Sequence, residues 1–110
     1  MDEKIKKIYV PMTETGFYIL LCLQDEMHGY GIVQKISELT DGYLTLGPGT
    51  IYGTLSKMEK DGLIRFTSEK DNKKFYIITE LGLKLLNYEK ERIKQLYYTV
   101  RADDIWNQKR

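Results

Sequence analysis

The stretch from residue 47 to residue 64 constrains the fold most, because it fixes both ends of one helix and starts a strand. Gly47 suits the N-cap and Pro48 the first helical position, where the missing backbone N–H of proline is not needed. Gly62 suits the left-handed residue that closes a helix, and the apolar, β-rich residues after it predict a strand. This stretch therefore predicts a helix of about four turns that leads directly into a strand.

The predicted helix has two different faces. Ile51, Leu55 and Met58 recur at the spacing of one helical face, which would pack on a core. The opposite face is small, hydroxylated and basic; it carries Gly49, Tyr52, Gly53, Ser56, Lys57 and Lys60. Small residues near a helix N-terminus let a partner approach the backbone, and the free N–H groups there attract phosphate oxygen. The pattern is typical of a DNA recognition helix, and the alternative is a surface helix with solvated lysines.

Length and composition exclude several classes of protein. At 110 residues the chain suits one domain with a modest core, and its net charge of +1 argues neither for nor against nucleic acid. Cys22 has no second thiol to pair with and no histidine cluster nearby, so we expect a buried spectator thiol, no metal site and no cofactor. The apolar run Gly16–Leu23 is too short to span a membrane, and the N-terminus lacks a signal-peptide pattern. We therefore expect a cytoplasmic protein.

We expect three parts along the chain. Residues 1–12 form an N-terminal arm or short helix that stops at Pro11, because the residue before a proline avoids helical geometry. Residues 13–79 form a winged helix-turn-helix domain. Residues 80–110 form a C-terminal dimerisation helix, with helix predicted to about Ala102. The predicted fold class is α+β, mostly helical.

Two helices are expected ahead of the helix that follows Gly47. The first would begin at a threonine cap, Thr13 or Thr15, and run to about Glu26. A turn at His28–Gly31 leads to the second, which ends near Asp41. Two helices joined by a few residues, the later one with a basic outer face, form a helix-turn-helix.

After the helix-turn-helix, the sequence predicts a β-hairpin that forms the wing. Alternating strands are expected at Leu63–Thr67 and Lys74–Thr79, joined by the polar six-residue link 68–73. Lysines near the tip would meet a DNA backbone. Because side chains alternate along a strand, one of Lys73 and Lys74 is expected to point away from DNA.

The C-terminal helix carries an apolar stripe near heptad spacing, formed by Leu86, Ile93, Leu96, Tyr97 and Val100. A small winged domain cannot cover the whole stripe, so we expect a second copy to cover it in a homodimer. The alternative is that the helix folds back on its own domain. Tyr97, Tyr98 and Trp106 would line a flat-ligand pocket between two such helices, or they belong to the dimer core.

We choose the candidate DNA contacts by their place on the predicted recognition helix and wing. They are Thr50, Tyr52, Gly53, Thr54, Lys57, Lys73 and Lys74. Lys57 is the strongest candidate for a phosphate contact, because it lies one or two turns inside the helix on the outer face. The phenol of Tyr52 would donate to a phosphate, or the ring is a half-buried packing residue.

No grouping of residues points to an enzyme. His28 has acidic neighbours, but a lone histidine at the junction of a turn and a helix is typical of capping or packing, and no nucleophile or carboxylate pair accompanies it. Gly47–Gly49 is not followed by Lys and Ser/Thr at the spacing of a phosphate-binding loop. We therefore predict no catalytic residues.

Three stretches resemble the PadR family of bacterial transcriptional regulators: His28–Ile32, Gly49–Ile64 and Lys73–Gly82. With their connections they span residue 13 to about residue 100. The resemblance implies a winged helix-turn-helix homodimer whose C-terminal helices form the dimer and whose wings flank DNA. The length resembles the short branch of the family, which has one C-terminal helix and includes multidrug-sensing repressors. A small hydrophobic or planar effector is therefore also implied.

The chain departs from the family pattern at three places. Gly47 stands where a serine is frequent, and Lys73 and Lys74 stand in a wing strand that is often richer in arginine. The best-known drug-binding members stack flat ligands on a tryptophan of the C-terminal helix, and the matching position here is about Ile93. Trp106 lies more than three turns later, so the ligand-stacking mechanism does not transfer to it directly.

Together these features predict a DNA-binding transcriptional regulator. We expect a ligand-responsive repressor that binds a pseudo-palindromic double-stranded operator as a homodimer, with two recognition helices about 34 Å apart. The alternative is a winged-helix protein-interaction module that does not bind DNA.

Overall fold

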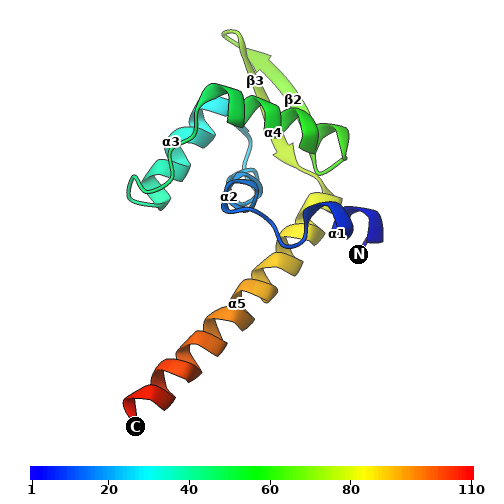
Figure 1. Cartoon of the computed structure of the whole chain (residues 1–110). Coiled ribbons are helices and arrows are strands. Elements are labelled where there is room, and N and C mark those ends of the chain that lie inside the picture. The colour runs from blue at the N-terminus through cyan, green and yellow to red at the C-terminus, as the bar shows by residue number, and fades with distance from the viewer.

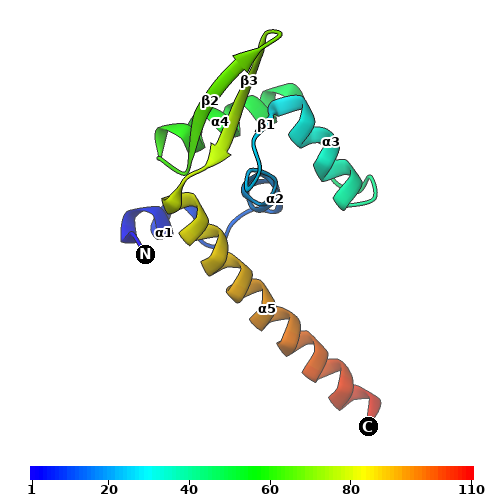
Figure 2. The same cartoon turned by 180° about the vertical axis from the view of Figure 1, so that it is seen from behind.

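The computed structural model describes residues 1–110 as five helices and a three-stranded antiparallel sheet (Figures 1 and 2). In chain order the elements are α1 (Glu3–Tyr9), α2 (Glu14–Cys22), β1 (Met27–His28), α3 (Gly29–Leu39), α4 (Pro48–Lys60), β2 (Ile64–Lys70), β3 (Lys73–Ile78) and α5 (Glu80–Gln108). Figure 1 shows α1 to β3 gathered into a body, from which most of α5 extends to the C-terminus. The predicted α+β winged helix-turn-helix with a long C-terminal helix is confirmed.

Local signals set the helix ends much as the sequence indicates. The Thr13 hydroxyl caps α2 by accepting the Gly16 N–H at 3.0 Å. Pro48 occupies the first turn of α4 after the N-cap Gly47, and Gly62 has φ +79° just beyond its end. Left-handed geometry at that position is strained for any residue with a Cβ, so glycine closes the helix.

The sheet contains a strand that the sequence analysis missed. Met27 and His28 pair antiparallel with Tyr76 and Phe75 of β3, although His28 was predicted to begin a turn, and the strand order is β1-β3-β2. A two-residue strand has no periodicity of its own to detect, because it exists only through its partner. The chain must leave α2 early to reach β3, so α2 ends at Cys22 and not near Glu26.

The wing is longer and its tip tighter than predicted. β2 continues to Lys70 and β3 starts at Lys73, so the six-residue link was wrong and only Asp71 and Asn72 form the turn. Their φ values are +53° and +62°. Two successive positive φ values match the twist of a hairpin, and Asp and Asn tolerate them best after glycine. The strand ends next to the turn are polar because both of their faces are exposed. The sequence there therefore looks like that of a loop.

One core joins the helices to the sheet. It collects Ile5 from α1 and fully buried aliphatic side chains from every later helix and from the start of β2: Ile19, Leu20, Leu23, Ile32, Ile36, Ile51, Leu55, Met58, Leu63, Ile64, Leu85 and Leu86. Burial of each large aliphatic side chain stabilises the fold by about 1.5–3 kcal/mol. The inward positions predicted for α4 are confirmed.

The long helix α5 joins this core only at its beginning. It contacts α2 and β3 there, and Leu85 and Leu86 have no exposed surface. Leu86 was assigned to the dimer or ligand surface, and this was wrong because the domain itself covers that part of the helix. α5 then continues six residues past the predicted end, to Gln108. No helix has the length and apolar character that a bilayer crossing requires.

Candidate nucleic-acid interface

Helix α4 lies at the edge of the body with the wing rising beside it (Figures 1 and 2). Ile51, Leu55 and Met58 are at most 2% exposed and hold its inner face in the core. The face opposite to them is open to solvent, and it includes Gly49, Gly53 and Lys60. The inner residues therefore fix the orientation in which the outer face is presented.

Gly49 and Gly53 are not required by the packing of the chain itself. A Cβ atom built on either one meets no atom within 4 Å. Glycine inside a helix is less stable than alanine by about 0.5–1 kcal/mol, so two glycines on one open face weaken α4 without an internal compensation. Their positions suit a surface that an external partner approaches closely.

On the wing side of α4, the structure brings Tyr52, Lys73 and Lys74 together. They line a cavity of about 500 Å³ between α4, the start of α3 and the wing, together with Ser56. Neighbouring residues on a strand point to opposite faces. Lys73 and Lys74 nevertheless both line this cavity, which lies at the turn end of β3. This is the most basic concave surface next to α4.

Tyr52 packs on the start of α3 and is still 56% exposed. A Cβ on Gly29 would lie 2.8 Å from its ring, so glycine at this position leaves room for the tyrosine. The Nδ1 atom of His28 accepts the Gly31 N–H at 3.2 Å and caps α3, while its ring contacts Phe75 edge-on. The lone histidine is thus a capping residue.

On the other side of α4, the candidate contacts face α1 and α2. The Thr54 hydroxyl donates to the Thr50 carbonyl at 2.8 Å. The Lys57 ammonium lies 3.3 Å from Oδ2 of Asp61, and the same oxygen accepts the Tyr9 hydroxyl at 2.7 Å. Lys57 is therefore separated from Lys73 and Lys74 and is already paired with an acid. Sequence reasoning missed Asp61 and Tyr9, because a contact over 52 residues leaves no local pattern.

Beyond the body, α5 presents an uncovered apolar stripe. The stripe continues the face that is buried at Leu85 and Leu86, and its members are 38–57% exposed: Ile93, Leu96, Tyr97 and Val100. Figures 1 and 2 show no other element beside this section, so α5 does not fold back on its own domain. Trp106 is 60% exposed. It lies about 130° around the helix from the middle of the stripe.

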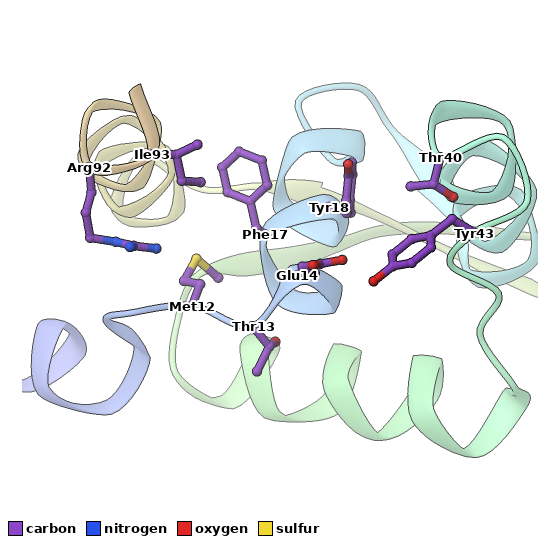
Figure 3. Close-up of a pocket in the computed structure, with 9 residues that line it drawn as sticks. All are labelled: Met12, Thr13, Glu14, Phe17, Tyr18, Thr40, Tyr43, Arg92 and Ile93. Carbon is purple, nitrogen blue, oxygen red and sulfur yellow. The ribbon is translucent and has the colours of Figure 1, made fainter. Parts of the chain in front are cut away.

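A second cavity, of about 580 Å³, lies where α5 leaves the body. Figure 3 shows Arg92 and Ile93 of α5 on one side and Tyr43 on the other, with Phe17 of α2 between them. The cavity thus contacts both the helix that carries the exposed stripe and the loop that leads into α4. Ile93, which stands where the resemblance places a ligand-stacking residue, lines this cavity, whereas Trp106 lines no cavity.

A buried carboxylate anchors α5 beside this cavity. Glu89 has no exposed surface and accepts the Met12 N–H at 2.6 Å, together with Nε and Nη2 of Arg92 at 2.5 and 3.1 Å. Burial alone raises the pKa of Glu89, but the hydrogen bonds from Arg92 and Met12 outweigh it and hold the pKa below its ordinary value. Glu89 therefore stays ionised and ties α5 to the segment before α2.

The remaining titratable groups do not form a reactive site. Burial raises the pKa of Cys22 to about 11, so its thiol stays protonated and unreactive at neutral pH. No group of three or more His, Cys, Asp or Glu side chains is arranged to hold a metal ion.

Comparison with known proteins identifies the family. Residues 19–88, well over half of the chain, match the model of the transcriptional regulator PadR-like family. The chain belongs to the PadR-like family of transcriptional regulators. The family is one of transcriptional regulators and not of enzymes, which confirms both the resemblance and the prediction that this chain is not an enzyme.

Individual relatives agree with this assignment. A transcriptional regulator from Escherichia coli, YqjI, is 33% identical over 79 residues; the match covers 72% of this chain and 38% of that relative, so this PadR-like chain spans under half of its length. A PadR-like regulator from Bacillus cereus superposes with a TM-score of 0.69 at 24% identity, over 92% of this chain and 95% of that one. Bacillus subtilis PadR in complex with operator DNA superposes with a TM-score of 0.61 at 26% identity, over 68% of this chain and 45% of that one.

Proposed function

We propose that this PadR-like regulator is a repressor that binds double-stranded operator DNA, with α4 in the major groove and the wing on the neighbouring backbone. The observation that carries the proposal is the open outer face of α4, where Gly49 and Gly53 have free space around them and the packing of the chain itself does not require glycine. A helix with small residues at its outer face approaches base edges closely.

The surroundings of α4 support a nucleic-acid partner. On the wing side, Tyr52, Lys73 and Lys74 line one cavity, so a phosphate would meet a phenol and two ammonium groups together. Thr50, Gly53, Thr54 and Lys57 complete the candidate contacts on the helix. The similarity to a PadR protein that was solved with operator DNA supports the same use of this surface.

A homodimer is part of the proposal. The exposed stripe of Ile93, Leu96, Tyr97 and Val100 continues a face that is buried where the domain covers it, and a second copy of α5 would cover the remainder. A two-fold dimer places two α4 helices on successive major grooves about 34 Å apart, which fits a pseudo-palindromic site.

Response to a ligand completes the proposal. A small hydrophobic or planar effector in the cavity of about 580 Å³ would contact α5 at Ile93 and the loop before α4 at Tyr43. It would change the angle between the body and the dimer helix, and so the separation of the two α4 helices. An effector that binds more tightly at one separation of the two α4 helices raises the population of dimers with that separation. Operator affinity then changes by an amount set by the difference in effector affinity between the two states.

The test is a gel-shift series with the intergenic DNA next to the gene at increasing salt concentrations. Specific binding of two chains per duplex, with affinity that falls steeply with salt, is the expected result. Salt-insensitive association with a protein and none with any duplex would select a winged-helix protein-interaction module in its place.

A further inference from the structure

The short helix α1 is attached directly to the C-terminal end of α4. Ile5 is 4% exposed and enters the core, and the Tyr9 hydroxyl donates to Oδ2 of Asp61 at 2.7 Å. Figure 1 shows α1 below the end of α4, where β2 begins. A seven-residue helix is not stable alone, so these contacts hold α1 in place.

Asp61 occupies an unusual position for an anion. It is the C-cap of α4, where the helix dipole disfavours negative charge, and its side chain is 17% exposed. The hydrogen bond from Tyr9, together with the hydrogen bond and the charge of Lys57, holds the pKa of Asp61 below its ordinary value although burial opposes this. Asp61 is therefore a fixed negative charge at the end of the candidate recognition helix.

Asp61 holds Lys57 toward α1. The Lys57 ammonium lies 3.3 Å from the Asp61 carboxylate and 5.5 Å from the centre of the Tyr9 ring. On an isolated helix, a lysine four residues before an acid is the weaker order and contributes only a few tenths of a kcal/mol. Here Tyr9 has already fixed the acid, so the pair loses less conformational entropy when it forms.

We infer that Tyr9 and Asp61 form a latch that keeps Lys57 paired and away from the DNA backbone, so that α1 lowers the affinity of α4 for DNA. This inference rests on the proposed function. Lys57 is 59% exposed on the outer side of α4, so it reaches a phosphate once the carboxylate no longer holds it. Tyr9 acts through Asp61 and is a positioning residue. Loss of the Tyr9 hydrogen bond would free the Asp61 carboxylate to move, so that Lys57 would be held only by an exposed ion pair within α4, and such pairs contribute little.

The experiment measures binding of full-length variants to a fluorescein-labelled, mixed-sequence duplex of about 25 base pairs over a salt series. Asp61→Asn keeps an oxygen for Tyr9 and removes the charge. We expect it to tighten binding about threefold to tenfold at low salt and to steepen the salt dependence by up to about one phosphate contact. Tyr9→Phe should act in the same direction with a smaller effect.

Two controls separate the latch from general electrostatics. In the Lys57→Ala background, the gain from Asp61→Asn should fall to that of Glu91→Gln, which removes one carboxylate beside Lys94 on α5. An equal gain with and without Lys57 would overturn the latch, as would weaker binding by Asp61→Asn. A wild-type protein that binds no duplex at any salt would overturn the proposed function instead.

A measurement without DNA tests the latch itself. Acetylation of Lys57 by an amine-reactive ester is followed by mass spectrometry, with Lys84 of α5 as the internal standard, because Lys60 also interacts with the Asp61 charge. Release from Asp61 should raise the Lys57 rate relative to Lys84 at least about twofold in Asp61→Asn. Equal relative rates in the wild type and in this variant would overturn the latch whatever the DNA result.

Discussion

Helices α4 and α5 both leave a wide surface uncovered, but the two surfaces have opposite chemistry. The outer face of α4 carries glycine, hydroxyl and lysine side chains, whereas the far section of α5 exposes leucine, valine and tyrosine. Each helix is fixed by an apolar face in the same core. The two helices therefore differ in the chemistry of the residues that the domain leaves exposed.

This contrast indicates two different partners. Exposed glycines with lysines at the sides suit a charged surface that comes close to the backbone, as a DNA duplex does. An exposed apolar stripe that continues a buried face suits a second apolar surface, and a copy of the same helix supplies one. The family to which the chain belongs regulates transcription, and both surfaces are needed for a dimeric DNA-binding regulator.

The largest expected effect comes from placing a charge on the α5 stripe. Leu96→Glu should convert the proposed dimer to monomers at micromolar concentration, because a buried unpaired carboxylate opposes association. Operator affinity should fall at least about 100-fold, because one half-site then binds alone. Light scattering and a gel shift measure the two effects. Gln95→Glu adds the same charge on the opposite side of α5 and should leave the oligomeric state and the operator affinity unchanged. An equal loss of affinity and of dimer in this variant would show that the stripe is not the dimer interface.

The next largest effect is expected at Glu89, which anchors the first section of α5 to the domain. Glu89→Gln should destabilise the fold by about 1–3 kcal/mol at neutral pH, because charged hydrogen bonds to Arg92 and Met12 are lost. The folded pKa of Glu89 lies below its unfolded value, so its contribution is complete above about pH 5 and declines as pH falls through the folded pKa. Urea unfolding of both proteins from pH 7 to pH 3 measures this. A difference that grows toward acid would contradict the assignment.

The basic cavity beside α4 is tested by removing its lysines together. Lys73→Ala with Lys74→Ala should weaken DNA binding about tenfold at moderate salt and reduce the salt slope by about one to two. Lys84→Ala with Lys90→Ala removes the same charge from α5 and serves as the control. If both double variants have the same slope, the wing makes no specific phosphate contact.

The smallest effect is expected at Gly53 of α4, where one substitution should change stability and DNA affinity in opposite directions. Gly53→Ala should stabilise the fold by about 0.5–1 kcal/mol, because the new Cβ meets no atom of the chain and alanine favours the helix. DNA affinity should nevertheless fall severalfold, because the Cβ lies where the duplex approaches. Thermal melting and fluorescence anisotropy measure these opposite changes. Thr99→Ala on α5 should also stabilise the helix without weakening DNA binding.

The sequence predicts the parts of this molecule that local chemistry decides. Gly47, Pro48 and Gly62 set the ends of α4, and the spacing of Ile51, Leu55 and Met58 identifies its inner face. These residues act within a few positions of one another, so their pattern is visible without a structure. The outer face of α4 follows directly from the same periodicity.

Long-range contacts decide what the sequence did not predict. β1 exists only because β3 lies beside it, and Leu86 is buried because α2 and β3 pack against the start of α5. Asp61 is joined to Tyr9 across 52 residues, so the pairing of Lys57 was not foreseeable. The hairpin tip was predicted too long because exposed strand positions carry polar residues like those of a loop.

The central claim is that two chains, joined through α5, present two α4 helices to one duplex. Light scattering of the protein alone and with its intergenic DNA tests it most directly. We predict a dimer at micromolar concentration and a complex of two chains with one duplex. A single chain that binds none of the promoter fragments would contradict the account.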